Sequence, residues 1–381
     1  MAPTTLCIKC WGGGGGGAVA SWAQSLIITT KQQTFATMGL PDGKPVQGSV
    51  YFYAPSKIAP IIFTVLFFIT GAWHLYQCIR LKCFKVTGLH PFCCLLFTVG
   101  FALRSYGAFN FDNLGIYIAS TICIYCAPPV LELANYHVLG RTLFYVPYFS
   151  PLHPGRTLTT FGFFSAAVEV LNALGVSYLS NPNIPQSTQN LGHILMKTAL
   201  IAQVVIMTSF IAMVLLVQRR CRRAGFTNRK VHGPILTMYI STFIIMTRTI
   251  YRIVEHFGVS RAPAKPGPDW DPMSLSPIVR YEWYFYVFEA MLMYWNSVLW
   301  NWRHPRNYLP EDYHVYLAQD GETEIMGPGW NDGQNWLVTF IDPFGWFIGK
   351  KEGTERPFWE TNGFEGVPLV KGAERKSGES V

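Results

Sequence analysis

Seven long runs of apolar residues constrain the fold of this chain more than any other feature. A helix that crosses a bilayer needs about 20 mostly apolar residues, and only helices or closed barrels satisfy their backbone hydrogen bonds in lipid. Half of the 381 residues are hydrophobic and only 14% are charged, whereas soluble domains carry about 25% charged residues. The pattern predicts an all-α, polytopic membrane bundle of seven transmembrane helices, over residues 58–79, 91–110, 115–140, 158–179, 194–217, 234–257 and 282–303.

The basic residues between these runs predict how the bundle is oriented. Loops on the cytoplasmic side of a membrane are enriched in Lys and Arg. Thirteen basic residues follow the first, third, fifth and seventh runs, and six of them lie within residues 219–230. The opposite side has five close to the runs. We therefore expect the N-terminus outside and the C-terminus in the cytoplasm. This basic rim explains the net charge of +8 without nucleic-acid binding.

Composition divides the chain into three regions. Residues 1–50 contain six consecutive glycines and predict a flexible, low-complexity segment. Residues 51–310 form the predicted seven-span domain, and residues 311–381 a cytoplasmic tail that is disordered in part. Within the tail, the apolar stretch 336–349 is too short to span, so it either lies at the membrane interface or packs on the bundle.

The sequence offers little for metal or cofactor chemistry. Cys7 and Cys10 are spaced CxxC, as are Cys123 and Cys126. A zinc site of this kind needs a second pair at a defined distance, and here one pair lies within a predicted span. The chain also lacks the GxSxG and HExxH motifs and a phosphate-binding loop. We predict no metal, no cofactor and no enzymatic activity.

Polar side chains share one helical face in three of the runs. Their spacing of three or four residues places each set on one stripe, and ionisable residues within a membrane usually face the bundle interior and pair with one another. The stripes are Ser165, Glu169 and Asn172; Arg248, Arg252 and Glu255; and Glu282, Glu289, Met293 and Asn296.

Two interpretations of these stripes remain open. The charged residues either fix helix register as buried ion pairs or line a cavity for an amphipathic substrate. Under the second interpretation, the candidate substrate-binding residues are Glu132, Glu169, Asn172, Gln203, Arg248 and Glu289. We interpret Arg252 and Glu255 as a structural ion pair, and Glu289 as a candidate partner of Arg248.

Two adjacent prolines interrupt the third run. Pro128 and Pro129 lack the backbone donors that a helix interior uses, so we expect the helix to break or kink there. A discontinuous helix beside a cavity is one device of membrane transporters, and a kink that only serves packing is the alternative.

Five stretches of the chain resemble the fungal lipid-translocating exporter family, over roughly residues 51–310. They read YFYAPSKIAPIIFTVLF, APPVLELANYHVLGR, LGHILMKTALIAQ, TRTIYRIVEHFG, and EWYFYVFEAMLM followed by WRHP. The resemblance implies a seven-span protein associated with resistance to aminosterols and toxic sphingoid long-chain bases. The residues that match the family pattern are Gln203, Arg248, Tyr251, Arg252, Glu255, Gly258, Glu282, Tyr286, His304 and Pro305.

The chain also departs from the family pattern. Glu289 stands where the family usually has Asp, and Ser165 and Asn172 stand where it has Asp and Gln. Glu169, one turn beyond Ser165, is a candidate replacement for the lost carboxylate. The connection 259–281 is longer than that of the family. These differences concern the substrate more than the fold.

The resemblance implies a protein that moves or exports amphipathic lipids such as long-chain bases, with membrane lipids as its partners. The expected location is the plasma membrane, with an internal membrane as the alternative. A seven-span receptor or lipid sensor is a second hypothesis. An intramembrane lipid hydrolase that uses His74, His137 and His304 is a third.

Overall fold

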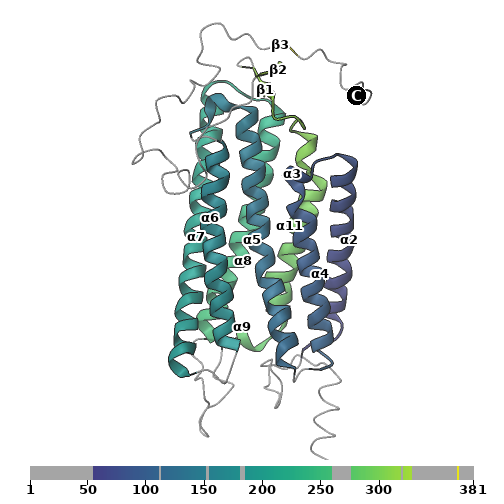
Figure 1. The fold of residues 1–381 in the computed structure, drawn as a ribbon, viewed down its shortest axis with the longest axis vertical. Helices are drawn as coiled ribbons and strands as arrows, with labels where there is room; N and C mark the ends of the chain where they lie inside the picture. Colours follow the sequence, from purple (N-terminus) through teal and green to yellow (C-terminus); the bar gives the residue numbers. More distant parts are fainter. Residues whose placement is uncertain are drawn as a thin grey trace, which may run out of the picture.

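The computed structural model describes residues 55–110, 113–151, 154–180, 185–259, 276–318, 321–327 and 367–368. These residues form a bundle of long helices that run side by side, with a small sheet at one end (Figure 1). Residues 1–50 and 336–349 lie outside the described residues, as do Cys7 and Cys10, so the predictions made for them stay predictions.

A helix covers each of the seven apolar runs. The last run is divided into α10 (Trp283–Phe285), the π-helical turn η3 (Tyr286–Met291) and α11 (Leu292–Trp302). The six long helices before it are α2 (Ala59–Arg80), α4 (Leu89–Gly107), α5 (Leu114–Tyr145), α6 (Pro154–Ser180), α7 (Gln186–Arg223) and α8 (Arg229–Val259). Short helical turns lie between them: α3 (Phe84–Thr87), η1 (Pro147–Phe149), α9 (Pro277–Arg280) and η4 (Pro305–Asn307).

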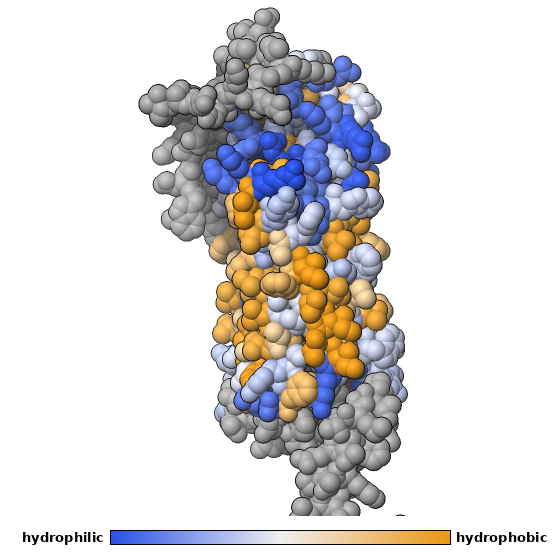
Figure 2. Space-filling view, turned by 90° about the vertical axis from the view of Figure 1, so that its right-hand side faces the viewer, coloured by the Kyte–Doolittle hydropathy of each residue, from blue (hydrophilic) through white to orange (hydrophobic). Residues whose placement is uncertain are grey.

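Five of these helices, α2, α4, α5, α6 and α7, are long and apolar enough to cross a membrane. Large apolar side chains project from their outer faces, as on α2, where Phe68 is 64% exposed. Figure 2 shows the result on one face of the molecule, where hydrophobic side chains form a band across the middle and hydrophilic residues lie toward both ends. Because such a band would be costly in water, these helices are membrane spans.

α5 lies at the centre of the packing. It contacts α4 and α6 on either side and α8 behind them, while α7 packs between α6 and α8, and α11 lies against α2 and α8. One part of the core is a cluster of stacked rings between α2 and α4, in which the ring centres of Phe67 and Phe97 are 4.5 Å apart. A second part surrounds Trp300 near the end that carries the sheet.

The paired prolines do not break α5. The helix runs without interruption from Leu114 to Tyr145, and Pro128 and Pro129 are both buried within it. The expectation of a discontinuous helix at this point is therefore wrong. Neighbouring helices hold the segment, and the thiol of Cys93 on α4 donates to the carbonyl of Ala127, the residue before the two prolines, at 3.2 Å.

The start of the tail forms a hairpin that the all-α prediction missed. β1 (Val315–Leu317) pairs antiparallel with β2 (Glu324–Met326), and β3 (Val367–Pro368) adds to the other edge of β2. Gly321 lies in the turn with a φ of +76°, a conformation that glycine adopts at little cost. We call β1 and β2 with their turn the tail hairpin.

The tail hairpin is docked on the helices. Val315 and Leu317 are buried in the core cluster around Trp300, and the Tyr145 hydroxyl on α5 donates to Glu324 at 2.8 Å. The guanidinium of Arg141 donates to the carbonyl of Pro310 at 2.8 Å. This part of the predicted tail is thus continuous with the helical core.

Candidate functional site

Two groups of polar residues occupy the interior of the bundle. The first, which we call the Glu289 network, comprises Glu289, Arg248, Arg252, Glu255 and Tyr125. The second, which we call the acceptor site, comprises Glu132, Glu169, Asn172 and Gln203. The two groups differ in how completely their hydrogen bonds are made, and this difference indicates what each can do.

Glu289 is the centre of the first group and is 0% exposed. Its Oε1 accepts from Arg248 Nε at 2.9 Å, and its Oε2 accepts from the same nitrogen at 2.8 Å and from Arg252 Nε at 2.6 Å. One carboxylate thus faces two arginines from α8. The sequence indicated the Arg248 partner, but it gave no sign that Arg252 would share it.

The π-helical turn explains how Glu289 reaches both arginines. η3 covers Tyr286–Met291 and includes Glu289. A π-turn widens the helix locally and is found mostly at functional or otherwise constrained positions. The turn also rotates the side chains that follow it relative to those that precede it. Glu282, Glu289 and Asn296 therefore share one face of the helix less closely than regular α-helical spacing predicts.

The remaining contacts of Arg252 complete the network. Its Nη1 donates to the Tyr125 hydroxyl on α5 at 2.9 Å and forms an ion pair with Glu255 one turn along α8. Glu255 also accepts from the Tyr251 hydroxyl at 3.0 Å. The structure therefore pairs Arg252 with Glu255, and it adds Tyr125, which sequence reasoning missed because no pattern links α5 to α8.

A second ion pair lies at the opposite end of the bundle from the tail hairpin. Arg104 of α4 donates to Glu282 at 2.8 Å, and the Tyr286 hydroxyl donates to the same carboxylate at 3.1 Å. The backbone N–H of Ser56 donates to the other oxygen of Glu282 at 2.7 Å. This pair fastens the start of α2 to α4 and α10.

The acceptor site lies between α5, α6 and α7. Glu132 is buried on α5, and its Oε1 accepts from the Gln203 amide of α7 at 2.5 Å. Its Oε2 accepts from the Tyr136 hydroxyl at 3.4 Å, and this hydroxyl accepts from Ser165 of α6 at 3.2 Å. Three helices thus meet at one carboxylate, and one of the contacts comes from Ser165, where the sequence departs from the pattern of the family it resembles.

Glu169 and Asn172 continue the acceptor site along α6. Glu169 is half-buried beside Cys126 of α5 and interacts electrostatically with both Glu132 and Arg248. Among the described residues, three oxygens of the site have no hydrogen-bond donor. They are Glu169 Oε2, Asn172 Oδ1 and Gln203 Oε1. Buried acceptors without donors are costly, so the site is suited to a ligand that donates hydrogen bonds.

Two glycines bring α6 and α7 close together beside this site. A Cβ on Gly175 of α6 would lie 2.6 Å from Met196 Cγ and 3.2 Å from the carbonyl oxygen of Gly192 on α7. Small residues at a contact allow membrane helices to approach closely. The contact therefore fixes the spacing between α6, which carries Glu169, and α7, which carries Gln203.

Histidines gather near the tail end of the bundle. His74 of α2 stacks on His90 of α4 with ring centres 5.1 Å apart, and His304 Nε2 lies 3.8 Å from Cys83 Sγ. His74 Nε2 is hydrogen-bonded to Ser297 at 3.2 Å. Within the described residues, no group of three or more His, Cys, Asp or Glu side chains is arranged to hold a metal ion.

Helices that are apolar outside and carry paired charges inside define an integral, multi-pass membrane protein. The chain belongs to the RTA1-like protein family, whose model matches residues 91–312. The resemblance to lipid-translocating exporters seen in the sequence is confirmed by this match and by the relatives below.

Three fungal relatives are similar to the chain. A lipid-translocating exporter-like protein RTA1 of Leptosphaeria maculans is 45% identical over 294 residues, which cover 75% of this chain and 56% of that protein. A protein of the same description from Ajellomyces capsulatus is 26% identical over 64% of this chain and 77% of its own length. A probable lipid transporter, atnI, of Emericella nidulans is 25% identical over 68% of each chain.

The chain thus spans little more than half the length of the Leptosphaeria relative. No solved structure matches it.

Proposed function

We propose that this protein translocates or exports amphipathic lipids with a cationic head group, such as sphingoid long-chain bases. The observation that carries the proposal is the acceptor site, which combines the carboxylates of Glu132 and Glu169 with three oxygens that lack donors among the described residues. An ammonium group has three donors and no acceptor, so its chemistry complements this site.

The geometry favours Glu169 over Glu289 as the carboxylate that meets the head group. Both oxygens of Glu289 already accept from arginines, so a bound ammonium would have to displace a buried cation. One oxygen of Glu169 has no donor among the described residues, and its side chain is only half-buried. Glu289 and Arg248 then hold the helices in register, and the residues of the acceptor site contact the substrate.

The surroundings of Glu169 also suit a lipid. Phe164 and Val170 on the same helix are 48% and 58% exposed on the apolar surface. A single-chain lipid could enter from the side, with its head group at Glu169 and its tail along this surface. No residue in this arrangement is assigned a catalytic step, and transport needs none.

The proposal includes a seven-span topology. α8 and the α10–η3–α11 segment lie within the bundle alongside the five apolar spans (Figure 1). Their charged residues face inward in ion pairs, which is how charged membrane helices reduce the cost of insertion. With seven spans, the basic connection 219–230 supports a cytoplasmic C-terminus, and export would require a location in the plasma membrane.

Efflux of a labelled sphingoid base from cells with and without the protein tests the proposal. We expect Glu169→Gln and Glu132→Gln each to lower the efflux rate about tenfold, which corresponds to about 1.4 kcal/mol. Glu311→Gln, the same change at an exposed carboxylate outside the bundle, is the matched control. An N-acylated base, which lacks the ammonium, should show no difference between the variants.

The proposal fails if Glu169→Gln and Glu132→Gln reach the membrane in normal amounts and export the base as fast as the unmodified protein. Surface labelling of intact cells measures the amount, so that a folding defect is not taken for a transport defect.

A lipid sensor is the second candidate function, and the docked tail hairpin favours it. Tyr145 and Arg141 connect the end of α5 directly to the tail, so a shift of α5 at Glu132 would be transmitted to that end. Efflux that is the same with and without the protein, together with hydrogen exchange in the tail hairpin that changes when a long-chain base is added, would favour this function over transport.

A further inference from the structure

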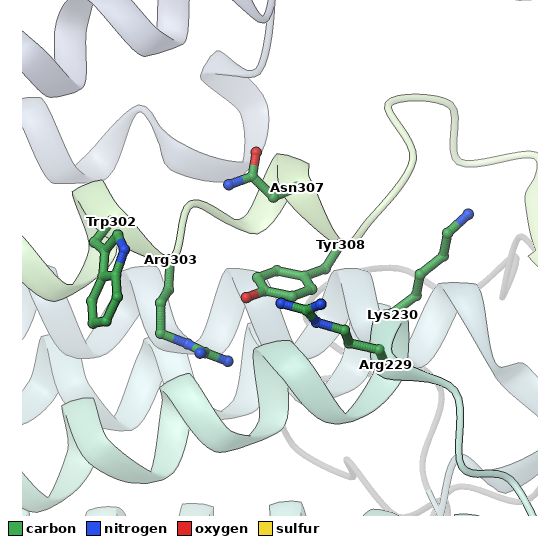
Figure 3. A pocket seen from close by; sticks show the side chains of 6 residues that line it. All are labelled: Arg229, Lys230, Trp302, Arg303, Asn307 and Tyr308. Carbon is green, nitrogen blue, oxygen red and sulfur yellow. The ribbon is translucent and has the colours of Figure 1, made fainter.

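The end of the bundle that carries the tail hairpin contains an open cavity of about 480 Å³. It lies where the start of α8 meets the end of α11 and the turn η4 (Figure 3). Its lining combines three basic residues with two aromatic residues and an amide: Arg229, Lys230, Arg303, Trp302, Tyr308 and Asn307. We call this cavity the basic pocket.

The positive charge of the basic pocket is only partly neutralised. Lys230 forms an ion pair with Glu324 at 2.6 Å, and the six described residues that line the cavity include no acidic one. Arg229 is exposed and makes no hydrogen bond or ion pair to the described residues. In Figure 3 the side chains of Arg229 and Arg303 both extend toward the middle of the pocket, where Tyr308 lies, while Lys230 is directed away from it.

The helices hold Arg303 in place. Its Nε donates to the Thr237 hydroxyl at 2.7 Å and its Nη2 to the carbonyl of Gly233 at 3.2 Å. The guanidinium carbon lies 5.5 Å from the centre of the Tyr308 ring. Because two of its nitrogens are bound to α8, Arg303 presents its remaining donors to the cavity at little cost in side-chain entropy.

Gly233 shapes the floor of the pocket. A Cβ at this position would lie 2.4 Å from Cε1 of Tyr308, so only glycine allows this ring to lie directly on α8. Trp302 is 77% exposed at the end of α11, where the apolar band gives way to hydrophilic residues. Tryptophan is favoured at the boundary between lipid and water, so the pocket lies at head-group level.

We propose that the basic pocket binds the phosphorylated head group of an anionic membrane lipid. Arginine donors match phosphate oxygens in charge and geometry, and the volume lies within the range of small-ligand sites. Because Trp302 is exposed beside the pocket, the acyl chains of a lipid bound by its head group could remain in the adjacent bilayer. The proposal does not depend on what the acceptor site transports, because the two sites share no residue.

Binding of a phosphatidylinositol phosphate to the purified full-length protein in phosphatidylcholine nanodiscs tests this proposal. A direct hydrogen bond between an arginine and a phosphate is worth about 1.5–3 kcal/mol, so we expect Arg229→Ala and Arg303→Ala each to weaken binding about tenfold or more. Arg222→Ala is the matched control, because it removes an exposed arginine of the same basic connection that does not line the cavity.

A second measurement separates lipid from soluble phosphate. We expect the water-soluble inositol phosphate of the same head group to bind more weakly than the lipid, because it gains nothing from Trp302 and the bilayer. The proposal is overturned if Arg222→Ala weakens lipid binding as much as Arg229→Ala, or if the soluble head group binds as tightly as the lipid. Arg229 is exposed, so its replacement should not alter the thermal unfolding of the protein, and this is measured in parallel.

Discussion

The Glu289 network and the acceptor site are both polar groups inside the same bundle, and they differ in whether their charges are matched. In the network, Glu289 faces Arg248 and Arg252, and each oxygen of its carboxylate has a donor. In the acceptor site, the carboxylates meet only neutral donors, and acceptor oxygens on both α6 and α7 have no donor among the described residues. A group whose bonds are complete holds helices together, whereas one with unused acceptors has capacity for a ligand.

The two groups are also connected, because Arg248 interacts electrostatically with Glu132 and Glu169. It is the cation that limits the negative charge of the acceptor site when no ligand is bound. Arg248 would therefore repel a cationic head group that entered the site and lower its affinity. Under the proposed function, such weakened binding would allow the head group to leave again.

The largest expected effect is the loss of Glu289. Glu289→Gln would leave Arg248 buried without a charged partner and Arg252 with Glu255 alone, and removal of one partner from a buried pair costs about 3–5 kcal/mol. We expect most of the protein to be lost from the membrane and the remainder to unfold at lower temperature, measured by fluorescence-detected size exclusion. Glu289→Asp keeps the charge and is the control. A Gln variant as stable as the original would show that the network is not structural.

A combined replacement tests whether the Glu289 network serves stability alone or transport as well. Exchanging Glu289, Arg248, Arg252 and Glu255 together for Leu, Met, Met and Leu removes all four charges of the network and leaves apolar groups of similar volume. Such exchanges are often neutral or stabilising, so we expect unfolding temperature to recover relative to Glu289→Gln. If efflux of the long-chain base recovers as well, the network serves the fold alone; if stability recovers and efflux does not, the network belongs to the transport site.

A smaller effect is expected at the contact between α6 and α7. Gly175→Val would force Met196 and the Gly192 backbone away, and overpacking of this kind costs about 1–3 kcal/mol. We expect lowered unfolding temperature and reduced efflux together, because Glu169 and Gln203 would move apart. Gly115→Val is the control, because a Cβ there meets only Asn113 Oδ1, at 3.4 Å. Unchanged efflux in a folded Gly175→Val protein would contradict the idea that this spacing defines the acceptor site.

For the acceptor site itself the expected effect on stability is the smallest within the bundle. Glu169→Gln keeps the shape of the side chain and removes a charge that lacks a full set of partners, so we expect a change below about 1 kcal/mol. The same variant should lose most of its efflux. A large fall in unfolding temperature would instead place Glu169 among the structural charges, and the contrast between the two groups would fail.

The tail hairpin gives the smallest effect and a dependence on pH. Partial burial would raise the pKa of the Glu324 carboxyl, but hydrogen bonds from Lys230 and Tyr145 outweigh it and hold the pKa below its ordinary value of 4.5. A lowered pKa stabilises the docked state above the ordinary value, and this contribution is lost as pH falls through the lowered pKa. We expect the protection of the hairpin amides against hydrogen exchange, corrected for their intrinsic exchange rates, to fall below pH 4.5, and Glu324→Gln should remove this dependence. A protection factor that is independent of pH in the unmodified protein would contradict the assignment.

Hydropathy alone predicted where the long helices lie, because a span needs an uninterrupted apolar run whatever its neighbours are. The charged stripe of α8 was visible for the same reason: Arg248, Arg252 and Glu255 recur at helical spacing. The sequence also indicated Glu132, Glu169, Asn172 and Gln203 as unusual residues for a membrane, since polar groups at that depth are costly wherever they point.

The sequence could not predict which side chains the charged and polar residues would contact. The π-turn that directs Glu289 to two arginines, the bond from Arg252 to Tyr125, and the continuity of α5 through Pro128 and Pro129 all depend on contacts between helices far apart in the chain. The tail hairpin was missed because its strands are three residues long and are stabilised by the bundle end on which they dock. Local composition determined which segments are long and apolar enough to enter the membrane, because that depends on each segment alone. Packing decided which charges are neutralised and which oxygens have no donor among the described residues, because partners come from other helices.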